Sequence, residues 1–396
     1  MRPELLFRCC TPLAVVPVSF PELFHYLRPH ITLTMNPLLL LIQLLKPLLY
    51  PFSLLYGAIM WLRNKLYDAG LISSIQFSVP VISVGNLSTG GTGKTPHIEY
   101  LIRLLQYEYR VATMSRGYKR STTGFYLAGP QTDARSIGDE PLQFYRKFPE
   151  IVVSVCEDRM TGIPRLLGEK PEVEVVLLDD AFQHRSVRPG LNMLIIDFAK
   201  PFYKDFILPF GSLRESRKAY RRADIIIVSK CPPHLAGGIQ QEMIARIKPL
   251  AHQQVFFSAI AYDTPVDFFT GEPLPLAAGA HVVMVSGIAK PESMLEHLKS
   301  AAAEVHLLRY PDHHYFTDAN LEEMRQTCNN WAVTQKVIVT TEKDATRLAM
   351  HADTLRQWQI PVAVLPIRVQ LLQDAPAFDV RVRDYIIKEK EDMIEG

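Results

Sequence analysis

Short apolar runs alternate with amphipathic stretches along most of this chain. Runs that are apolar throughout predict strands at 79–84, 110–114, 151–155, 173–178, 193–197 and 224–229. Patterns with one apolar face predict helices at 94–106, 139–148, 215–222 and 238–248. Apolar strands separated by helices are typical of a parallel sheet that is covered on both faces. We therefore expect an α/β fold built on a parallel sheet.

A second, smaller block of alternating elements follows a segment with the composition of a linker, rich in Pro, Gly, Ala and Asp, at 261–280. Strands are predicted in this block near 281–286, 304–309, 336–341 and 361–367, and helices near 291–301 and 318–333. We therefore expect a first domain over 69–255, a linker over 256–280, a smaller α/β domain over 281–368 and a tail over 369–396.

The first part of the chain follows a different pattern. Residues 1–34 contain several prolines and no sustained period, whereas an organised apolar run begins just after Met35. We expect translation to start at Met35 and residues 1–34 to be an unstructured upstream extension. A signal peptide is a weaker alternative, because Glu4 and the prolines interrupt the pattern that such a peptide needs.

Residues 38–62, within a segment 35–68, predict an amphipathic helix. The less apolar side chains fall on one face at 100° per residue, and they are Gln43, Lys46, Tyr50, Ser53, Gly57 and Asn64. The uncharged run 47–62 is shorter than the roughly 20 residues that span a bilayer. We expect a helix that lies in a membrane interface and that Pro47 and Pro51 kink or divide. A true span and an ordinary core helix are the alternatives.

Composition and charge narrow the class of protein. Lys and Arg number 43 and Asp and Glu 41, so there is no basic excess of the kind that nucleic-acid binding usually shows. Hydrophobic residues make up 48% of the chain and charged residues 21%, which excludes a disordered protein. The five scattered cysteines fit free thiols in a reducing compartment.

A glycine-rich loop follows the strand predicted at 79–84. The segment GNLSTGGTGKT at 85–95 matches the phosphate-binding pattern G-x-x-x-x-G-K-[ST], except that serine replaces its first glycine. The residues expected to bind nucleotide are Ser88, Thr89, Gly90, Gly91, Thr92, Gly93, Lys94 and Thr95. Backbone N–H groups and the start of the next helix would surround the phosphates. We expect Lys94 to reach the β- and γ-phosphates and Thr95 to bind Mg²⁺.

Asp179 and Asp180 follow the apolar strand predicted at 173–178. Two adjacent carboxylates at one sheet edge are unfavourable unless a cation lies beside them, and Mg²⁺ is the expected cation. The glycine-rich loop and the acidic pair together predict a site for a nucleoside triphosphate with Mg²⁺. They do not identify the group that accepts a phosphate.

Further polar clusters lie at predicted strand ends, where open α/β sheets bind ligands. They are SRGYKR at 115–120, GDEP at 138–141, AFQH at 181–184, PFGSLRE at 209–215, YPDHHYF at 310–316 and TTEKD at 340–344. Ordinary structural roles are open for them as well. Asp139 suits a helix cap, the basic turn suits a solvated loop, and the histidines suit a surface.

These clusters together resemble one family. The segments SVGNLSTGGTGKTP, SRGYKR, GDEPLQ, DDAFQHR, LPFGSLRE, DHHYF and TTEKDA occur in this order after an apolar N-terminal helix. They are similar to the tetraacyldisaccharide 4′-kinase family of lipid A biosynthesis, over about residues 36–370. The family also carries serine at the position of Ser88.

The resemblance implies an activity and an architecture. It implies transfer of the ATP γ-phosphate to the 4′-hydroxyl of tetraacyldisaccharide 1-phosphate, which gives lipid IVA. It also implies a P-loop domain joined by a two-stranded linker to a smaller α/β domain, with ATP bound in the cleft between them. The enzyme would be monotopic, on the cytoplasmic face of the bacterial inner membrane. Its partners would be the lipid and the membrane surface, with no nucleic acid and no obligate protein partner.

The resemblance also assigns roles to residues. The catalytic group would be Lys94, Asp139, Asp180, Gln183, His184, Arg214, Glu215 and His313. Asp139 would be the general base and His313, next to Asp312, its partner. Mg²⁺ would be held by Thr95, Asp179 and Asp180. The lipid headgroup would lie near Ser115, Arg116 and Tyr118. A sugar hydroxyl has a very high pKa, so a carboxylate must accept its proton as the new bond forms.

Two other functions remain open. One is a membrane-associated P-loop ATPase switch, although Ser88 and Thr89 stand where such switches often carry a lysine and a switch needs no base such as Asp139. The other is a P-loop kinase for a soluble small molecule, which would leave the apolar helix without a role.

Overall fold

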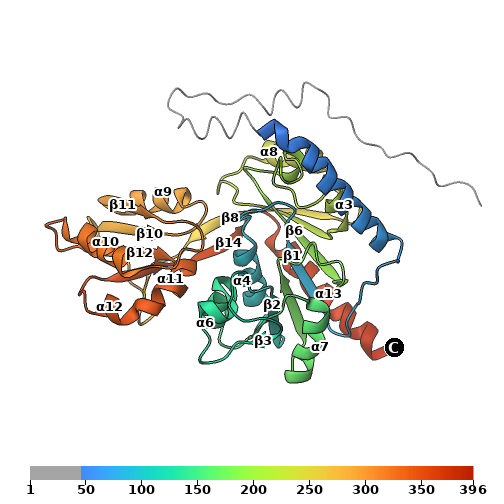
Figure 1. Ribbon diagram of the computed structural model, residues 1–396, viewed down its shortest axis with the longest axis horizontal. Coiled ribbons are helices and arrows are strands. Elements are labelled where there is room, and N and C mark those ends of the chain that lie inside the picture. The colour runs from blue at the N-terminus through green and yellow to red at the C-terminus, as the bar shows by residue number, and fades with distance from the viewer. Residues whose placement is uncertain (1–45, 396) are drawn as a thin grey trace, which may run out of the picture.

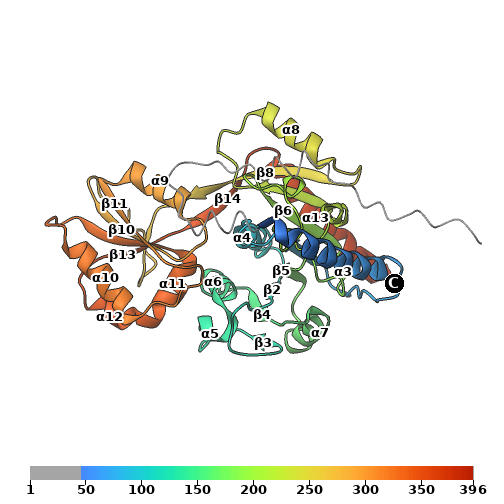
Figure 2. The same cartoon turned by 45° about the horizontal axis from the view of Figure 1, so that its top comes forward.

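The structure is a computed structural model that describes residues 46–395. The predictions for residues 1–34 and for the first part of the helix at 38–62 lie outside these residues. Figures 1 and 2 show two lobes. The first lobe is built on a nine-stranded sheet and the second lobe on a five-stranded sheet. The chain crosses between the lobes twice, through β8 and through β14.

The sheet of the first lobe has the strand order β14-β8-β7-β6-β1-β5-β2-β4-β3. The strands from β8 to β4 run parallel, and the outer strands β14 and β3 are antiparallel to their neighbours. The strands are β1 (Val81–Gly85), β2 (Val111–Ser115), β3 (Tyr126–Leu127), β4 (Val152–Val155), β5 (Val175–Asp179), β6 (Leu191–Asp197), β7 (Ile225–Ser229), β8 (Gln254–Tyr262) and β14 (Ile367–Leu371). The expected α/β fold with a large parallel sheet is confirmed.

Helices cover both faces of this sheet because successive strand residues point to opposite sides. Val175 and Leu177 pack in a core with α4, α6 and α13, whereas Val176 and Leu178 pack in another core with α7. The helices are α4 (Lys94–Leu105), α5 (Ala134–Ile137), α6 (Asp139–Lys147), α7 (Arg159–Glu169), α8 (Gly237–Ile247) and α13 (Ala375–Glu395), with 3₁₀ turns η2 (Phe202–Lys204) and η3 (Arg217–Arg222). The segment expected as a helix at 215–222 forms only η3, because the chain must extend again to enter β7.

The second lobe has the strand order β11-β10-β12-β13-β9, with only β9 antiparallel. Its strands are β9 (Val266–Asp267), β10 (His281–Ser286), β11 (Glu304–Arg309), β12 (Lys336–Thr341) and β13 (Val362–Leu365). Its helices are α9 (Glu292–Ala301), α10 (Asp318–Asn329), α11 (Glu342–Leu348) and α12 (Ala352–Arg356), with the 3₁₀ turn η4 (Ala349–His351) between the last two. The strand expected at 361–367 is split between two sheets at Pro366, which has no N–H to donate to a ladder.

The junction of the lobes is an antiparallel ribbon of β8 and β14, in which Tyr262 pairs with Ile367 and Ser258 with Leu371. The start of the expected linker, 256–262, therefore lies within β8. Residues 369–396, expected as a tail, contain the end of β14 and the helix α13. Its positions 378, 382 and 386 carry apolar side chains that pack in the core of the first lobe. Residues four apart lie on one face of a helix, so this spacing is the sequence signal for α13.

The helix α3 (Tyr50–Asp68), after the 3₁₀ turn η1 (Lys46–Leu49), lies on the outside of the first lobe (Figure 1). Pro51 is in its first turn, where no helical N–H is needed, so it does not kink α3. Polar side chains face the protein. Ser53 Oγ donates to the carbonyl of Ile207 at 2.8 Å, and Asn64 Nδ2 donates to Glu215 Oε2 at 2.8 Å.

The opposite face of α3 and η1 is apolar and exposed. Its largest exposed side chains are Leu48, Phe52, Leu54, Leu55, Ile59, Trp61 and Leu62. Among the helices that the structure describes, none is long and apolar enough to cross a membrane.

Candidate functional site

The glycine-rich loop connects the carboxyl end of β1 to the start of α4. Gly90 has a φ of 108° and Gly93 a φ of 93°, in the region that L side chains avoid. A Cβ at Gly93 would also lie 2.8 Å from Ser229 Oγ. Asn86 Nδ2 donates to Thr92 Oγ1 at 2.9 Å and closes the loop from within. The loop therefore has the conformation of a phosphate cradle.

Ser88 occupies a position that does not need glycine. It forms an isolated antiparallel bridge with Leu213, and the next N–H, that of Thr89, donates to the carbonyl of Ser212 at 2.8 Å. The segment 212–214 therefore pairs with the start of the cradle and holds it against the first lobe. Lys94 and Thr95 begin α4 directly after Gly93.

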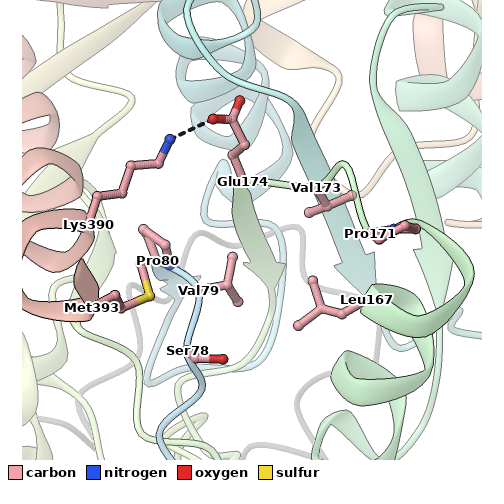
Figure 3. Close-up of a pocket in the computed structure, with 9 residues that line it drawn as sticks. All are labelled: Ser78, Val79, Pro80, Leu167, Pro171, Val173, Glu174, Lys390 and Met393. Atoms are coloured by element: carbon pink, nitrogen blue, oxygen red, sulfur yellow. Dashed lines mark hydrogen bonds and ion pairs between the residues drawn. The ribbon is translucent and has the colours of Figure 1, made fainter. Parts of the chain in front are cut away.

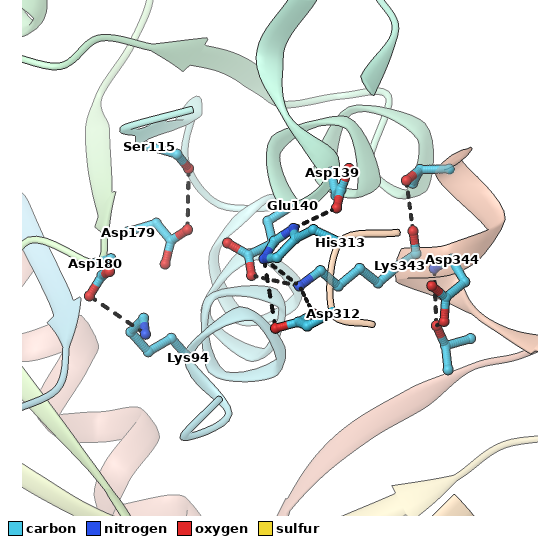
Figure 4. Close-up of polar contacts among 12 residues, drawn as sticks. Lys94, Ser115, Asp139, Glu140, Asp179, Asp180, Asp312, His313, Lys343 and Asp344 are labelled. Carbon is cyan, nitrogen blue, oxygen red and sulfur yellow. Dashed lines mark hydrogen bonds and ion pairs between the residues drawn. The ribbon is translucent and has the colours of Figure 1, made fainter. Parts of the chain in front are cut away.

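The two acidic residues at the carboxyl end of β5 face different partners (Figure 4). Asp180 lies 3.5 Å from Lys94 Nζ and accepts from Arg214 Nη1 at 2.9 Å. Burial by itself would raise the pKa of Asp180, but the positive charges of Lys94 and Arg214 outweigh it and lower the pKa. Asp179 is buried and accepts from Ser115 Oγ at 3.3 Å.

The environment of Asp179 is suited to a cation. Burial, together with the nearby charge of Glu140, raises the pKa of Asp179 to about 7. Its Oδ1 atom is buried and has no hydrogen-bond partner among the described residues. Asp179 has one unsatisfied oxygen, and it lies close enough to Lys94 for the charge of that lysine to act on it. Such a carboxylate fits Mg²⁺, which prefers oxygen ligands. No group of three or more His, Cys, Asp or Glu side chains suited to a metal occurs in residues 46–395. Such a group is not needed where phosphates and water complete the shell.

The residues after Asp180 return toward α3. Gln183 Nε2 donates to the carbonyl of Asn86 at 2.8 Å and to Glu215 Oε1 at 3.1 Å. Glu215 is buried, and Arg222 donates to it at 2.7 Å. Arg214 points into the site, to Asp180, whereas Glu215 binds the side chains that anchor α3. Gln183 and Glu215 thus connect the cradle to α3.

His184 and the expected headgroup residues lie on the other side of the acidic pair. Arg159 is fully buried. It donates to the carbonyl of Asp179 at 3.1 Å, and its Nη1 lies 3.3 Å from His184 Nε2. Burial and the Arg159 charge lower the pKa of His184 to about 4, so its ring is neutral near pH 7. The charge of Arg116 acts on the same ring in the same direction. Tyr118 lies further along, with its ring centroid 5.4 Å from that of His313.

Asp139 and His313 meet across the lobes. Asp139 begins α6 in the first lobe, and His313 lies in the loop after β11 in the second lobe, yet His313 Nδ1 is 2.8 Å from Asp139 Oδ2 (Figure 4). Asp139 is buried, and His313 has a φ of 62°. Asp139 is not the helix cap, because the N-cap of α6 is Gly138. Its side chain instead forms a contact between the two lobes.

Sequence reasoning missed three cations at this site. They are Arg159 beside Asp179, Lys230 beside the cradle, and Arg347 beside the contact of the lobes. It found Lys343 within the cluster TTEKD but gave it no role. Lys230 Nζ donates to the carbonyl of Gly91. The sequence could have indicated Lys230, because this residue directly follows β7 and therefore lies at the same sheet edge as the cradle. Arg347 gave no signal, because it lies inside a helix and its position depends on how the lobes meet.

Two hollows lie apart from the cradle. One, of about 390 Å³, is at the amino ends of β1 and β5, where Lys390 bridges it by an ion pair with Glu174 at 2.6 Å (Figure 3). It is at the sheet edge opposite the cradle and does not belong to the site. The other, of about 300 Å³, lies between the lobes and is lined by Lys119, Ser121, Arg135 and Tyr315. Two of its lining residues are close in sequence to site residues: Lys119 follows Tyr118, and Tyr315 lies two residues after His313.

The fold and the cradle define a class of protein. A parallel sheet with a phosphate-binding loop, a lysine at the start of the next helix and an acidic pair on the neighbouring strand is the arrangement of a P-loop nucleotide-binding protein. Asp139, held by His313, fits a general base that accepts the proton of an attacking hydroxyl, a group that a phosphotransferase needs.

The chain belongs to the tetraacyldisaccharide-1-P 4′-kinase family, whose model matches residues 45–386. It is 45% identical over 338 residues to the tetraacyldisaccharide 4′-kinase of Bacteroides thetaiotaomicron, covering 82% of this chain and 89% of that protein. It is 44% identical over 346 residues to that of Flavobacterium johnsoniae, covering 87% and 98%. The resemblance found in the sequence is confirmed.

A solved structure shares the fold. The crystal structure of LpxK from Aquifex aeolicus in complex with ATP has a TM-score of 0.66 and 28% identity to this chain, covering 86% of this chain and 99% of that one. That structure contains ATP, the nucleotide expected for the cradle described above.

Proposed function

We propose that this protein transfers the γ-phosphate of ATP to the 4′-hydroxyl of tetraacyldisaccharide 1-phosphate, to give lipid IVA. The observation that carries the proposal is the contact of Asp139 with His313, 2.8 Å apart, next to the cradle and the acidic pair. A nucleotide switch needs no such pair. Membership of the kinase family supports the acceptor.

Asp139 accepts the proton of the sugar hydroxyl as the phosphoryl group arrives. His313 and Arg347 both contact Oδ2 of Asp139, so Oδ1 is the oxygen available to the hydroxyl. Proton acceptance is needed because the alkoxide is too basic to form on its own near pH 7. The acid and the histidine come from different lobes, so the base is complete only when the lobes are in contact. This arrangement limits transfer of the phosphate to water.

The cradle residues 88–93 hold the phosphates with their N–H groups, and Lys94 neutralises charge on the transferred group. Thr95 and Asp179 would bind Mg²⁺, which when bound supplies positive charge to the phosphate oxygens. Asp180 acts through Lys94 and Arg214 because both cations already contact it. Gln183 and Glu215 position the cradle relative to α3. His184 is neutral and contacts Arg159, which in turn binds the carbonyl of Asp179. The lipid headgroup would bind near Ser115, Arg116 and Tyr118.

The helix α3 places the site at a membrane surface, on the cytoplasmic face of the bacterial inner membrane where ATP is available. Its polar side is bound to the first lobe, and Tyr56 Oη donates to the carbonyl of Arg214 at 3.0 Å. Its apolar side, with Phe52, Leu55 and Ile59, is free to enter the headgroup region. The same helix therefore contacts both the catalytic loop and the lipid.

A lipid kinase assay tests this proposal. The purified protein is mixed with γ-labelled ATP and tetraacyldisaccharide 1-phosphate in phospholipid–detergent micelles, and the label in the lipid is measured. We expect Asp139→Asn to reduce kcat by about 10²- to 10⁴-fold and to leave KM for ATP within about twofold. Asp318→Asn, which changes an exposed aspartate on α10, is the matched control. Intact ATP hydrolysis with no label in the lipid would contradict the proposal.

A further inference from the structure

The helix α11 of the second lobe places two cations on either side of the Asp139–His313 pair. Lys343 and Arg347 are four residues apart, so they lie on one face of α11. Lys343 Nζ is 3.2 Å from His313 Nε2, and Arg347 Nη1 is 3.4 Å from Asp139 Oδ2 (Figure 4 shows Lys343). One cation therefore contacts each member of the pair.

The contact with Lys343 determines where the proton of His313 lies. An ammonium group only donates hydrogen bonds, so His313 Nε2 must accept and carries no proton. The ring is then neutral and carries its hydrogen on Nδ1, which donates to Asp139 Oδ2.

Other groups also face His313. Asp312 Oδ2 lies 3.9 Å from its Nε2, and the ring of Tyr118 lies edge-on to it. Lys343 also lies 3.2 Å from Asp312 and 3.8 Å from Glu140. Asp312 and Glu140 therefore hold the ammonium group of Lys343 next to the His313 ring. Lys343 is the cation that contacts Nε2.

Arg347 is anchored by a buried ion pair. Its side chain is fully buried and pairs with Asp344, another buried residue of α11. Asp344 in turn accepts from the N–H of Gly287 at 3.0 Å and from Thr341 Oγ1 at 2.7 Å. The guanidinium is thus anchored in the second lobe and directed at the first. It contacts the same oxygen of Asp139 as His313 does.

We propose that Lys343 and Arg347 are positioning residues that prepare Asp139 to accept the proton. Lys343 keeps His313 as the neutral Nδ1–H tautomer, so that the ring donates to Asp139 without forming an imidazolium. Arg347 fixes the carboxylate through Oδ2 and directs Oδ1 to the acceptor. This inference rests on the proposed function, in which Asp139 takes the proton of the sugar hydroxyl.

The Lys343→Met variant provides the first test, with Lys299→Met on the exposed surface of α9 as the matched control. In the lipid kinase assay we expect Lys343→Met to reduce kcat about tenfold at pH 6.5 and to leave KM for ATP within about twofold. A kcat for Lys343→Met equal to that of Lys299→Met would overturn the role of Lys343.

A double-variant comparison separates positioning from general damage. In an Asp139→Asn background, Lys343→Met and Arg347→Met should each change the residual kcat by less than about twofold, because the group they act on is gone. Arg347→Met leaves Asp344 buried without its cation, so its folded fraction is measured by ATP binding. Lys343 is partly exposed, and its variant keeps the test valid if Arg347→Met does not fold. Full additivity of either variant with Asp139→Asn would overturn the proposal for that residue.

Nitrogen NMR tests the tautomer without any acceptor. The ring nitrogens of His313 are assigned by comparison with His313→Gln. We expect the wild-type spectrum to show the Nδ1–H tautomer, with Nε2 unprotonated, and Lys343→Met to show a smaller share of it under the same conditions. Identical ring-nitrogen spectra of the two proteins would overturn the proposal. If the wild-type protein fails to label the lipid but shows this difference, the proposed function fails and the arrangement of the pair stands.

Discussion

Lys147 on α6 connects three parts of the molecule, and its removal should destabilise the fold. Its Nζ lies 2.6 Å from Glu99 on α4, the helix that follows the cradle, and it also pairs with Glu342, the first residue of α11. Glu99 is only 1% exposed. Burial and the charge of Glu99 raise the pKa of Glu342. Lys147 therefore keeps two carboxylates together at the contact of the lobes, one buried and the other mostly buried, with 12% of its side chain exposed.

The magnitude follows from what Lys147→Met leaves behind. Removing one partner of a buried ion pair costs about 3–5 kcal/mol. Here the side chain of Lys147 is 20% exposed, and Glu99 keeps its hydrogen bond from Gln143 and its ion pair with Arg103. We therefore expect a loss of about 2 kcal/mol in the free energy of unfolding at pH 7. Glu342→Gln in the same chain should restore about half of it, because one of the two charges is then absent.

The loss should also depend on pH. Without Lys147, the pKa of Glu342 in the folded protein rises further above its unfolded value of about 4.3. Between these two values the folded protein binds more protons than the unfolded chain, so the free energy of unfolding falls as the pH rises. The deficit of Lys147→Met should therefore be larger at pH 8 than at pH 5.

Urea unfolding, followed by tryptophan fluorescence at pH 5, 7 and 8, measures this effect. Lys388→Met on the exposed face of α13 is the matched control and should change stability by less than about 0.5 kcal/mol. A deficit below about 0.5 kcal/mol for Lys147→Met, or one that does not grow with pH, would refute the reasoning.

Two further predictions concern the anchors of the first lobe. The double variant Leu55→Glu, Ile59→Glu should reduce flotation with anionic phospholipid vesicles by at least about tenfold, because both exposed side chains would enter the headgroup region. The control is Tyr107→Glu, which changes an exposed aromatic residue in the turn after α4. Equal flotation of the wild-type protein and both variants would contradict the role of α3. Tyr385→Phe should lower the free energy of unfolding by about 1–2 kcal/mol, because the N–H of Val81 loses the hydroxyl acceptor 3.0 Å away; unchanged thermal unfolding would contradict it.

Local patterns in the chain were sufficient for part of this molecule. The cradle, Lys94 and the acidic pair are encoded by a strand, a turn and a helix start that are contiguous in sequence, so their geometry depends little on distant residues. Most strands appear where the apolar runs predict them, because strands buried on both faces carry nearly continuous apolar residues. The polar side chains of α3 also indicated that its two faces would have different surroundings. They did not show that the polar face binds Glu215.

Long-range contacts decided the rest. The split of 361–367 at Pro366, the return of the chain through β14 and the docking of α13 depend on pairing with segments more than a hundred residues earlier. A single sequence carries little information on such pairings. Residues 369–396 were predicted to be a tail because their apolar positions are few and lie on one face. The structure shows that this face packs in the core of the first lobe.

The family, the nucleotide cradle and the alternation of strands and helices can all be predicted from the chain alone, because each is encoded in neighbouring residues. Only the tertiary structure brought Asp139 to His313 and placed Lys343 and Arg347 on either side of that pair. These groups lie on two lobes and are joined by no local motif. Their meeting depends on how α6 and α11 pack, which is a property of the whole fold.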